Sequence, residues 1–215
     1  MEIKLDLHVH TCYSHDGLIT PEELIKYTRR AGLDGVAVTD HNRVDGALKL
    51  AKKFNLLIIP GIEVSSDGGH IIGLNVSEPV PSGLSMEETI EKIHKLGGIA
   101  IICHPYSLVK SMLKKISLSS KLDAIEVINA SAFPFNRSVN YARQLAINLK
   151  LPQVAGSDAH YAPEIGSAYT IIDSEKNPED ILRAIQKGLC KPVGKGIPLK
   201  TKIKKQILRL VANKL

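Results

Sequence analysis

The sequence predicts an α/β protein built on a mainly parallel sheet. Short apolar runs of four to six residues alternate with helical patterns six or seven times, and the runs are of the buried, β-rich type. The chain has 215 residues, 44% hydrophobic and 23% charged, which fits one domain with a packed core. From this pattern alone, a closed or distorted barrel and an open doubly wound sheet are both compatible with the alternation.

In the first half of the chain, strands and helices are expected in turn. The strands are predicted at residues 3–7, 36–39 and 56–60, with paired strands at 62–65 and 70–76. Thr20, Pro21 and Glu23 predict the start of the first helix, because they combine a capping box with a proline in the first turn. Gly32 ends that helix, and a second helix is expected over residues 44–54.

The second half continues the alternation. Ser85 and Glu88 form another capping box, which predicts a helix to residue 96. The remaining strands are predicted at residues 99–103, 124–128 and 153–155, and the helices at 136–148 and 177–188. Residues 109–122 carry four lysines, which predict a solvated helix, with a basic lid over a cleft as the alternative.

The net charge of +6 is concentrated at the C-terminus. Residues 1–190 carry 20 basic and 22 acidic residues, whereas residues 191–215 carry eight basic residues and no acidic one. We therefore predict a main domain over residues 1–197 and a basic amphipathic helix over 198–215. This helix is expected to dock on the domain or to join a homo-oligomer, with anionic lipid or nucleic acid as alternative partners. Its apolar face is predicted to consist of Ile203, Ile207, Leu210 and Val211.

Composition excludes several classes of protein. Three cysteines without a Cys-x-x-Cys motif cannot form a disulfide framework, and the N-terminus lacks the pattern of a signal peptide. No apolar stretch reaches the length of a transmembrane helix. The three cysteines are expected to be free thiols, which favours a cytoplasmic protein. Aromatic residues make up 4% of the chain and tryptophan is absent, which disfavours a surface for stacking single-stranded bases.

Seven of the eight histidines lie at or just after the predicted C-terminal ends of strands, or in the loops that follow. A single histidine there is usually structural, but His8 and His10 share one face of a strand, and several acidic residues join them. Imidazoles mixed with carboxylates predict two or three divalent ions of zinc, manganese or iron, rather than calcium or magnesium alone. The candidate ligands are His8, His10, His15, Asp16, His41, Glu63, His70, His104, Asp158 and His160.

Six motifs in this order resemble the PHP family, the polymerase and histidinol phosphatase domains. They are Asp6-Leu7-His8-Val9-His10-Thr11, Ser14-His15-Asp16-Gly17, Thr39-Asp40-His41-Asn42, Gly61-Ile62-Glu63, His104-Pro105 and Gly156-Ser157-Asp158-Ala159-His160. The resemblance implies a distorted (β/α)7 TIM-like barrel, a single domain, with a trinuclear metal centre and metal-dependent phosphoesterase activity.

The resemblance also implies a division of the ligands among three ions. His8, His10, Glu63 and Asp158 would hold the first ion. His41 and His160 would hold the second with Asp16 or His15, because the first loop is one residue longer than in many members and leaves both open. Glu63 would bridge to a third ion held with His70 and His104.

The expected function is hydrolysis of a small phosphomonoester by a metal-bridging hydroxide. Asp40 is expected to orient an imidazole, with proton transfer to the leaving group as the alternative. Arg43 and Arg137 are candidate phosphate ligands, and Asn129 is a candidate polar contact. The alternatives are a nuclease or nucleotide phosphodiesterase with the same centre, and a non-catalytic RNA-binding barrel.

Overall fold

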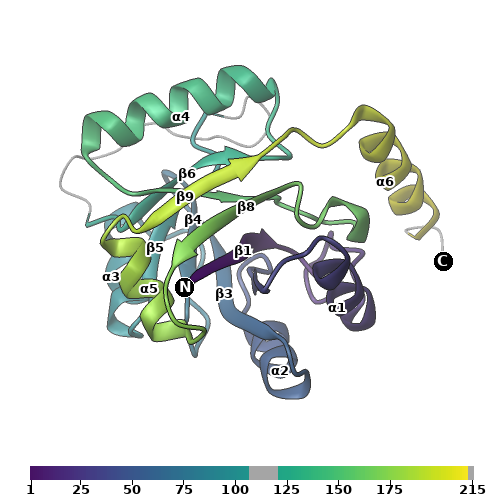
Figure 1. Ribbon diagram of the computed structural model, residues 1–215, viewed down its shortest axis with the longest axis horizontal. Coiled ribbons are helices and arrows are strands. Elements are labelled where there is room, and N and C mark those ends of the chain that lie inside the picture. The colour runs from purple at the N-terminus through teal and green to yellow at the C-terminus, as the bar shows by residue number, and fades with distance from the viewer. Residues whose placement is uncertain (107–120, 213–215) are drawn as a thin grey trace.

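Nine strands form one sheet in the computed structural model, which describes residues 1–106 and 121–212 (Figure 1). The strands are β1 (Glu2–Val9), β2 (Gly35–Val38), β3 (Leu57–Ser66), β4 (Gly69–Leu74), β5 (Ile99–Ile102), β6 (Ala124–Asn129), β7 (Gln153–Gly156), β8 (Ala168–Asp173) and β9 (Cys190–Gly194). Their order across the sheet is β7-β6-β5-β4-β3-β2-β1-β8-β9. Most of the segment at 109–122, predicted to be a helix or lid, lies outside the described residues.

Six α-helices and one 3-10 turn are present in the described ranges. They are α1 (Pro21–Arg30), α2 (Asp45–Lys53), α3 (Met86–Lys95), α4 (Phe135–Leu149), α5 (Pro178–Gln186), α6 (Leu199–Ala212) and the turn η1 (Ala162–Glu164). Thr20 caps α1 and Ser85 caps α3 through the capping boxes that the sequence predicts. None of the helices among the described residues is both long and apolar enough to cross a membrane.

The sheet curves into a nearly closed barrel, because β7 at one end of the strand order meets β1 and β8. The backbone N–H of Asp158, just after β7, donates to the carbonyl of His8 at 2.8 Å. On β8, the Thr170 hydroxyl donates to the carbonyl of Ala155 and accepts from its N–H, at 2.9 and 2.8 Å. The predicted fold class, a distorted TIM-like barrel, is confirmed.

The strand directions differ from the expected mainly parallel sheet. Among the described strands, four neighbouring pairs are parallel and four are antiparallel. The antiparallel pairs arise because β4 folds back on β3, and because β8 and β9, which the sequence did not predict, add beside β1. The expectation of a mainly parallel sheet is therefore wrong.

The two strands predicted at residues 56–60 and 62–65 are one continuous strand, β3. Its first half pairs with β2 up to Pro60, and its second half pairs with β4 from Gly61 onward. Pro60 has no backbone N–H to donate, so it fits the point at which the strand changes partners. This change of partner carries Glu63 toward the ends of the neighbouring strands.

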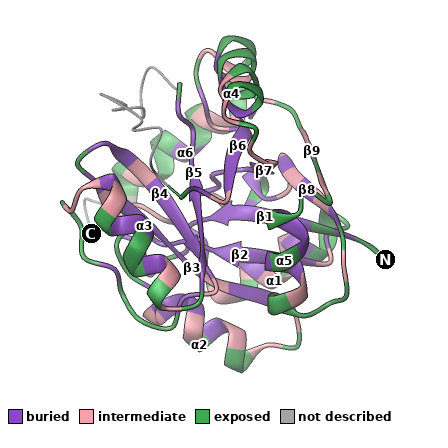
Figure 2. Ribbon diagram, turned by 90° about the vertical axis from the view of Figure 1, so that its left-hand side faces the viewer, coloured by how far each residue is buried: buried purple, intermediate pink, exposed green. Residues whose placement is uncertain are grey.

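The core divides into two groups of buried side chains. One group joins Ile3, Leu5 and Leu7 of β1 to Ile181 and Ile185 of α5. The second group joins apolar residues of the sheet to the buried faces of α1, α2, α3 and α4. In Figure 2 strands β1 to β6 are mostly buried, whereas each of the labelled helices α2, α3 and α4 has an exposed face. Strand β9 has no buried residue.

Helix α6 lies on the side of the molecule away from α3 and α5 (Figure 1). It docks on the domain through basic side chains, since Lys205 is buried and Arg209 is partly buried. The apolar face predicted for docking is exposed instead, with Ile207 56% exposed and Val211 56% exposed. The division of the chain at residue 197 and the homo-oligomer formed through this helix stay predictions.

Candidate metal centre

Side chains from several strands and from the loops that follow them converge at one edge of the barrel. His8, Glu63 and His70 lie on β1, β3 and β4, and the others lie just after β1, β2, β5 and β7 or in the loop that follows β1. Nine of the ten predicted ligands belong to groups of potential metal-binding atoms. These nine are His8, His10, Asp16, His41, Glu63, His70, His104, Asp158 and His160.

The His-x-His motif at the end of β1 places two imidazoles side by side. Nε2 of His8 lies 3.1 Å from Nε2 of His10, and Nδ1 of His8 lies 2.9 Å from a carboxylate oxygen of Glu126. Burial lowers the pKa of His8, but the neighbouring carboxylates of Glu126, Asp158 and Glu63 outweigh it and raise this pKa well above its ordinary value. Glu126 therefore fixes the ring so that Nε2 faces the cluster.

Gly156 at the end of β7 makes this arrangement possible. A Cβ atom at this position would lie 2.4 Å from Cβ of His8 and 2.9 Å from a carboxylate oxygen of Glu126. Any side chain there would displace one of the two partners. Steric exclusion of a side chain thus explains why glycine occupies the first position of the Gly-Ser-Asp-Ala-His motif.

Glu63 lies at the centre of the cluster and is 1% exposed. Its Oε1 lies 2.8 Å from Nδ1 of His70 and 2.9 Å from Nε2 of His104. Its Oε2 lies 3.1 Å from Nε2 of His10 and 3.1 Å from Nδ1 of His41. Burial raises the pKa of Glu63, but the surrounding histidines outweigh it and hold this pKa well below its ordinary value, so the carboxylate is ionised.

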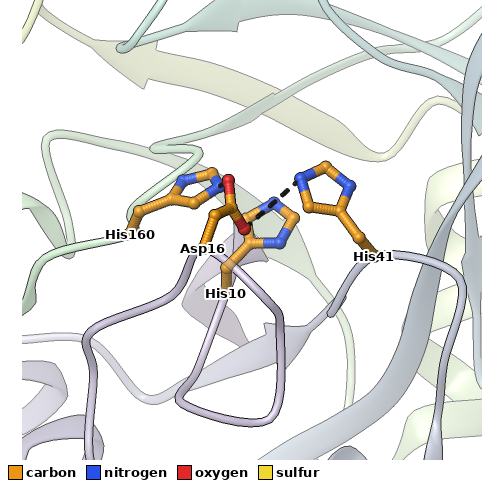
Figure 3. Close-up of side chains that lie close together, drawn as sticks. All are labelled: His10, Asp16, His41 and His160. Carbon is orange, nitrogen blue, oxygen red and sulfur yellow. Dashed lines mark ion pairs between the residues drawn. The ribbon is translucent and has the colours of Figure 1, made fainter. Parts of the chain in front are cut away.

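A second group consists of His10, Asp16, His41 and His160, which point toward one another in Figure 3. Oδ2 of Asp16 lies 3.0 Å from Nε2 of His160, and Oδ1 of Asp16 lies 3.8 Å from Nε2 of His41. Burial raises the pKa of Asp16, but the hydrogen bond and charge of His160 outweigh it and lower this pKa.

His15 is exposed and belongs to none of the groups among the described residues. Its ring centre lies 5.3 Å from that of His41. Of the two residues that the sequence leaves open in the first loop, the structure therefore brings Asp16, and not His15, to the potential ligands.

The donor set fits divalent ions. Within each group the potential ligand atoms all lie within 4.8 Å of one another, as atoms around a common ion would. Oε2 of Glu63, Nδ1 of His10 and Nδ1 of His104 are buried without a hydrogen-bond partner among the described residues. Burial lowers the pKa of His10 to about 3 and that of His41 to about 4, and a neutral imidazole is the form that binds a metal.

Backbone strain is concentrated at two of these positions. His104 has a φ of 35° and Asp158 a φ of 55°, in the left-handed region that non-glycine residues rarely adopt. The backbone N–H of His104 donates to Glu126 at 2.9 Å, and that of Asp158 donates to His8. These bonds hold both residues in a costly conformation, which is typical of functional sites.

The side chains of Asp40 and Asn129 form hydrogen bonds with neighbouring residues of the protein. Asp40 accepts the backbone N–H of Thr11 at 2.6 Å and its hydroxyl at 2.8 Å, and burial raises the pKa of Asp40 to about 6. Asn129 donates to Glu126 at 2.9 Å and to Asp158 at 3.2 Å. Asp40 thus anchors the start of the first loop, and Asn129 orients two carboxylates of the cluster.

Among the described residues, both predicted phosphate-binding arginines contact partners outside the ligand groups. Arg43 forms a bidentate ion pair with Asp45 and donates a hydrogen bond to the carbonyl oxygen of Tyr13. Arg137 is exposed, and its guanidinium carbon lies 5.4 Å from the ring centre of Tyr141.

Two residues at the cluster were missed from the sequence. Sγ of Cys103 lies 3.4 Å from Oε1 of Glu63, and its place directly before His104 at a strand end was the available signal. Arg209 of α6 lies 3.3 Å from Asp16, and no local pattern links two residues so far apart in the chain.

Comparison with known families agrees with this cluster. Residues 6–117, which include seven of the nine clustered residues, match the PHP domain family, and residues 136–190 match the PHP-associated family. The chain belongs to the PHP domain family. It is accordingly an enzyme, a hydrolase of the metal-dependent phosphoesterase class that acts on phosphate esters.

Relatives and solved structures extend this comparison. An uncharacterised protein of Methanocaldococcus jannaschii is 40% identical over 141 residues, which cover 60% of this chain and 82% of that protein. A 5'-3' exoribonuclease of Haemophilus influenzae is 30% identical over 108 residues, which cover 47% of this chain and 39% of the exoribonuclease.

Among solved structures, a two-domain protein from Bacteroides vulgatus containing a predicted PHP-like metal-dependent phosphoesterase superposes with a TM-score of 0.74 at 20% identity. The match covers 91% of this chain and 65% of that one. The PHP fold is therefore shared, while this chain spans less than two thirds of that structure and well under half of the exoribonuclease.

Proposed function

We propose that this PHP domain hydrolyses small phosphomonoesters with two or three divalent ions of zinc, manganese or iron. The observation that carries the proposal is the overlap of the ligand groups. Glu63 belongs to three of the five groups, and His8, His10, His41 and His104 each belong to two. Shared ligands are the way in which proteins hold metal ions close enough to act together on one phosphate.

The arrangement supports a division of roles among the side chains. His8, His10, Glu63 and Asp158 would hold one ion, and Asp16, His41 and His160 a second. Glu63 would reach a third with His70 and His104. A thiol at Cys103 beside Glu63 is compatible with zinc or iron, because these metals accept sulfur ligands.

When bound, the ions would supply an activated water and stabilise negative charge on the phosphoryl oxygens. The chain's own residues prepare the site for this chemistry. Glu126 and Asn129 orient His8 and Asp158, and Thr11 holds the carboxylate of Asp40. Asp40 is thereby assigned to positioning the loop that carries Asp16, because both of its carboxylate oxygens are engaged by Thr11.

A nuclease activity is the second candidate. It is favoured by the exoribonuclease relative, and it would use the same centre on a phosphodiester. The basic helix α6 beside the cluster is compatible with a polyanionic substrate. The proposal also includes a cytoplasmic location, which is supported by three free cysteines.

Turnover of two chromogenic substrates distinguishes the candidates. We expect the manganese-loaded protein to hydrolyse p-nitrophenyl phosphate faster than bis(p-nitrophenyl) phosphate or a short oligonucleotide. His10→Ala should reduce turnover by about a thousandfold or more, because it removes a ligand shared by two groups. The matched control is His94→Ala, since His94 lies on α3 and pairs with Asp123 outside the cluster.

Two results would contradict the proposal. Full activity in His10→Ala would exclude the assigned centre. Cleavage of the oligonucleotide or the diester in preference to the monoester would establish the nuclease instead.

A further inference from the structure

Helix α6 faces the domain with three basic side chains spaced along one face. Nζ of Lys202 donates to the carbonyl of Ser131 at 3.2 Å. Nζ of Lys205 lies 2.8 Å from Oε1 of Glu164, and Nη2 of Arg209 lies 2.6 Å from the carbonyl oxygen of Asp16. Positions three and four apart share a helix face, so this contact surface is continuous.

Two of these contacts lead to the same metal-ligand group. Oε2 of Glu164 accepts the backbone N–H of His160 at 3.0 Å, so Lys205 is tied to the segment that carries His160. Arg209 contacts both the carbonyl and the carboxylate of Asp16, at 2.6 and 3.3 Å. Asp16 and His160 are in turn 3.0 Å apart. Helix α6 therefore contacts the two loops that form the outer part of the cluster.

This part of the cluster borders solvent. The side chains of Asp16 and His41 are 27% and 14% exposed, whereas those of His8 and His10 are fully buried. A substrate would reach the cluster from its exposed side. Arg209, itself 27% exposed, stands at that side.

Arg209 has hydrogen-bonding capacity left over. Among the described residues its hydrogen bonds come from Nη2 alone, which leaves Nη1 to donate to a ligand, while Nε is enclosed. It is also the one described lysine or arginine in ion-pair contact with a member of the ligand groups. A phosphoryl group carries negative charge on several oxygens, and the planar guanidinium is the side chain best suited to bind two of them.

We infer that Arg209, supplied by the C-terminal helix, binds a phosphoryl oxygen of the substrate beside the ion that Asp16 would hold. Lys205 and Glu164 fix the helix in the position that this contact needs. The inference rests on the proposed function, because it assigns the cation that complements the metal ions in holding the phosphate. It also gives the basic C-terminal segment a specific role at the active site.

The test compares phosphate binding in matched variants of the full-length, manganese-loaded protein. Arg209→Gln removes the charge at the site, whereas Lys204→Gln removes the same charge from an exposed position of the same helix. Isothermal titration with inorganic phosphate should show a dissociation constant about tenfold higher in Arg209→Gln, as expected for the loss of a charge-assisted hydrogen bond. Lys204→Gln should bind within about twofold of the wild type.

Three further measurements exclude a merely structural role. Bound manganese and melting temperature should match the wild type in Arg209→Gln, while KM for p-nitrophenyl phosphate should rise. Arg209→Lys keeps the positive charge but loses the paired N–H donors of the guanidinium, so it should bind phosphate with intermediate affinity. This variant also preserves the test if Arg209→Gln does not fold.

The outcomes separate the inference from the proposed function. Unchanged phosphate affinity and KM in Arg209→Gln would overturn the inference while leaving the phosphatase intact. Loss of bound manganese in that variant would overturn it as well, because Arg209 would then be positioning Asp16. Phosphate binding that depends on Arg209 in a protein that hydrolyses no phosphomonoester would support the inference and contradict the proposed function.

Discussion

Helices α5 and α6 are both amphipathic and both lie near the C-terminus, yet they bury opposite faces. Helix α5 buries Ile181 and Ile185 against the apolar side chains of β1 and its neighbours. Helix α6 leaves Ile203 and Ile207 exposed and buries Lys205 instead. The difference lies in what each helix meets, because α5 meets an apolar core and α6 meets the carboxylates of Glu164 and Asp16.

This contrast separates stability from function in the molecule. The surroundings of α5 are typical of a folding core, in which burial of apolar surface supplies the free energy. The surroundings of α6 hold buried charges that are costly unless paired, an arrangement that proteins use mainly at functional sites. Substitutions on the two helices should therefore affect different properties.

The largest effect on stability is expected at the buried ion pair of α6. Lys205→Met leaves the carboxylate of Glu164, which is 0% exposed, without its cation. The free energy of unfolding should fall by about 3–5 kcal/mol, the cost of breaking a buried pair. Urea denaturation measures this change, with Lys204→Met as the exposed control. A loss equal to that of the control would mean that α6 is not held by this pair.

A somewhat smaller loss is expected on α5. Ile185→Ala deletes a fully buried side chain and should lower the free energy of unfolding by about 2–4 kcal/mol. Turnover of p-nitrophenyl phosphate per folded molecule should not change, because α5 contacts none of the ligands. A fall in turnover in a fully folded variant would show that the packing of α5 affects the geometry of the metal-ligand cluster.

The reactivity of the Cys190 thiol reports on burial in the core that α5 covers. Burial raises the pKa of Cys190 to about 11, despite its contact with the carbonyl of Gln153. At pH 8 the folded protein should therefore contain about a hundredfold less Cys190 thiolate than the unfolded chain. Iodoacetamide labelling followed by mass spectrometry should show slow modification in buffer and fast modification in urea. Equal rates in both would contradict the burial of this thiol.

The smallest effect is expected on the exposed face of α6. Ile207→Ser changes a side chain that is 56% exposed, so the free energy of unfolding should move by less than about 0.5 kcal/mol. Differential scanning fluorimetry would compare the melting temperature of Ile207→Ser, on the exposed face of α6, with that of Ile185→Ala, on the buried face of α5. Marked destabilisation by Ile207→Ser would show that this face is covered in solution.

The sequence predicted which polar side chains lie close together better than it predicted the strand directions of the sheet. Strand-end histidines and acids could be assigned because the carboxyl ends of neighbouring strands meet at one edge, and this placed His8 and Asp158 in a common cluster. The strand β9 was missed because its segment contains Pro192 and Gly194 and becomes a strand by pairing with β8. Such long-range pairing leaves no local pattern to read.

The docking of α6 was only half predicted. The periodicity of residues 198–211 correctly indicated an amphipathic helix, but the apolar face was expected to pack. Which face packs depends on Glu164 and Asp16, whose positions are set by the folded barrel. Local sequence favours Arg43, two residues after His41, and Arg137, at a helix start, as phosphate ligands, whereas Arg209 reaches the cluster across 193 positions of the chain.

Metal content compared between the wild type and Glu63→Gln tests the central claim most directly. Glu63 is common to three ligand groups, and the neutral amide keeps its shape while removing its charge. After loading with manganese and dialysis, elemental analysis should find two or three equivalents in the wild type and at least one fewer in Glu63→Gln, with hydrolysis of p-nitrophenyl phosphate lost in parallel. Less than one equivalent in the wild type, or equal content and turnover in both proteins, would contradict the account.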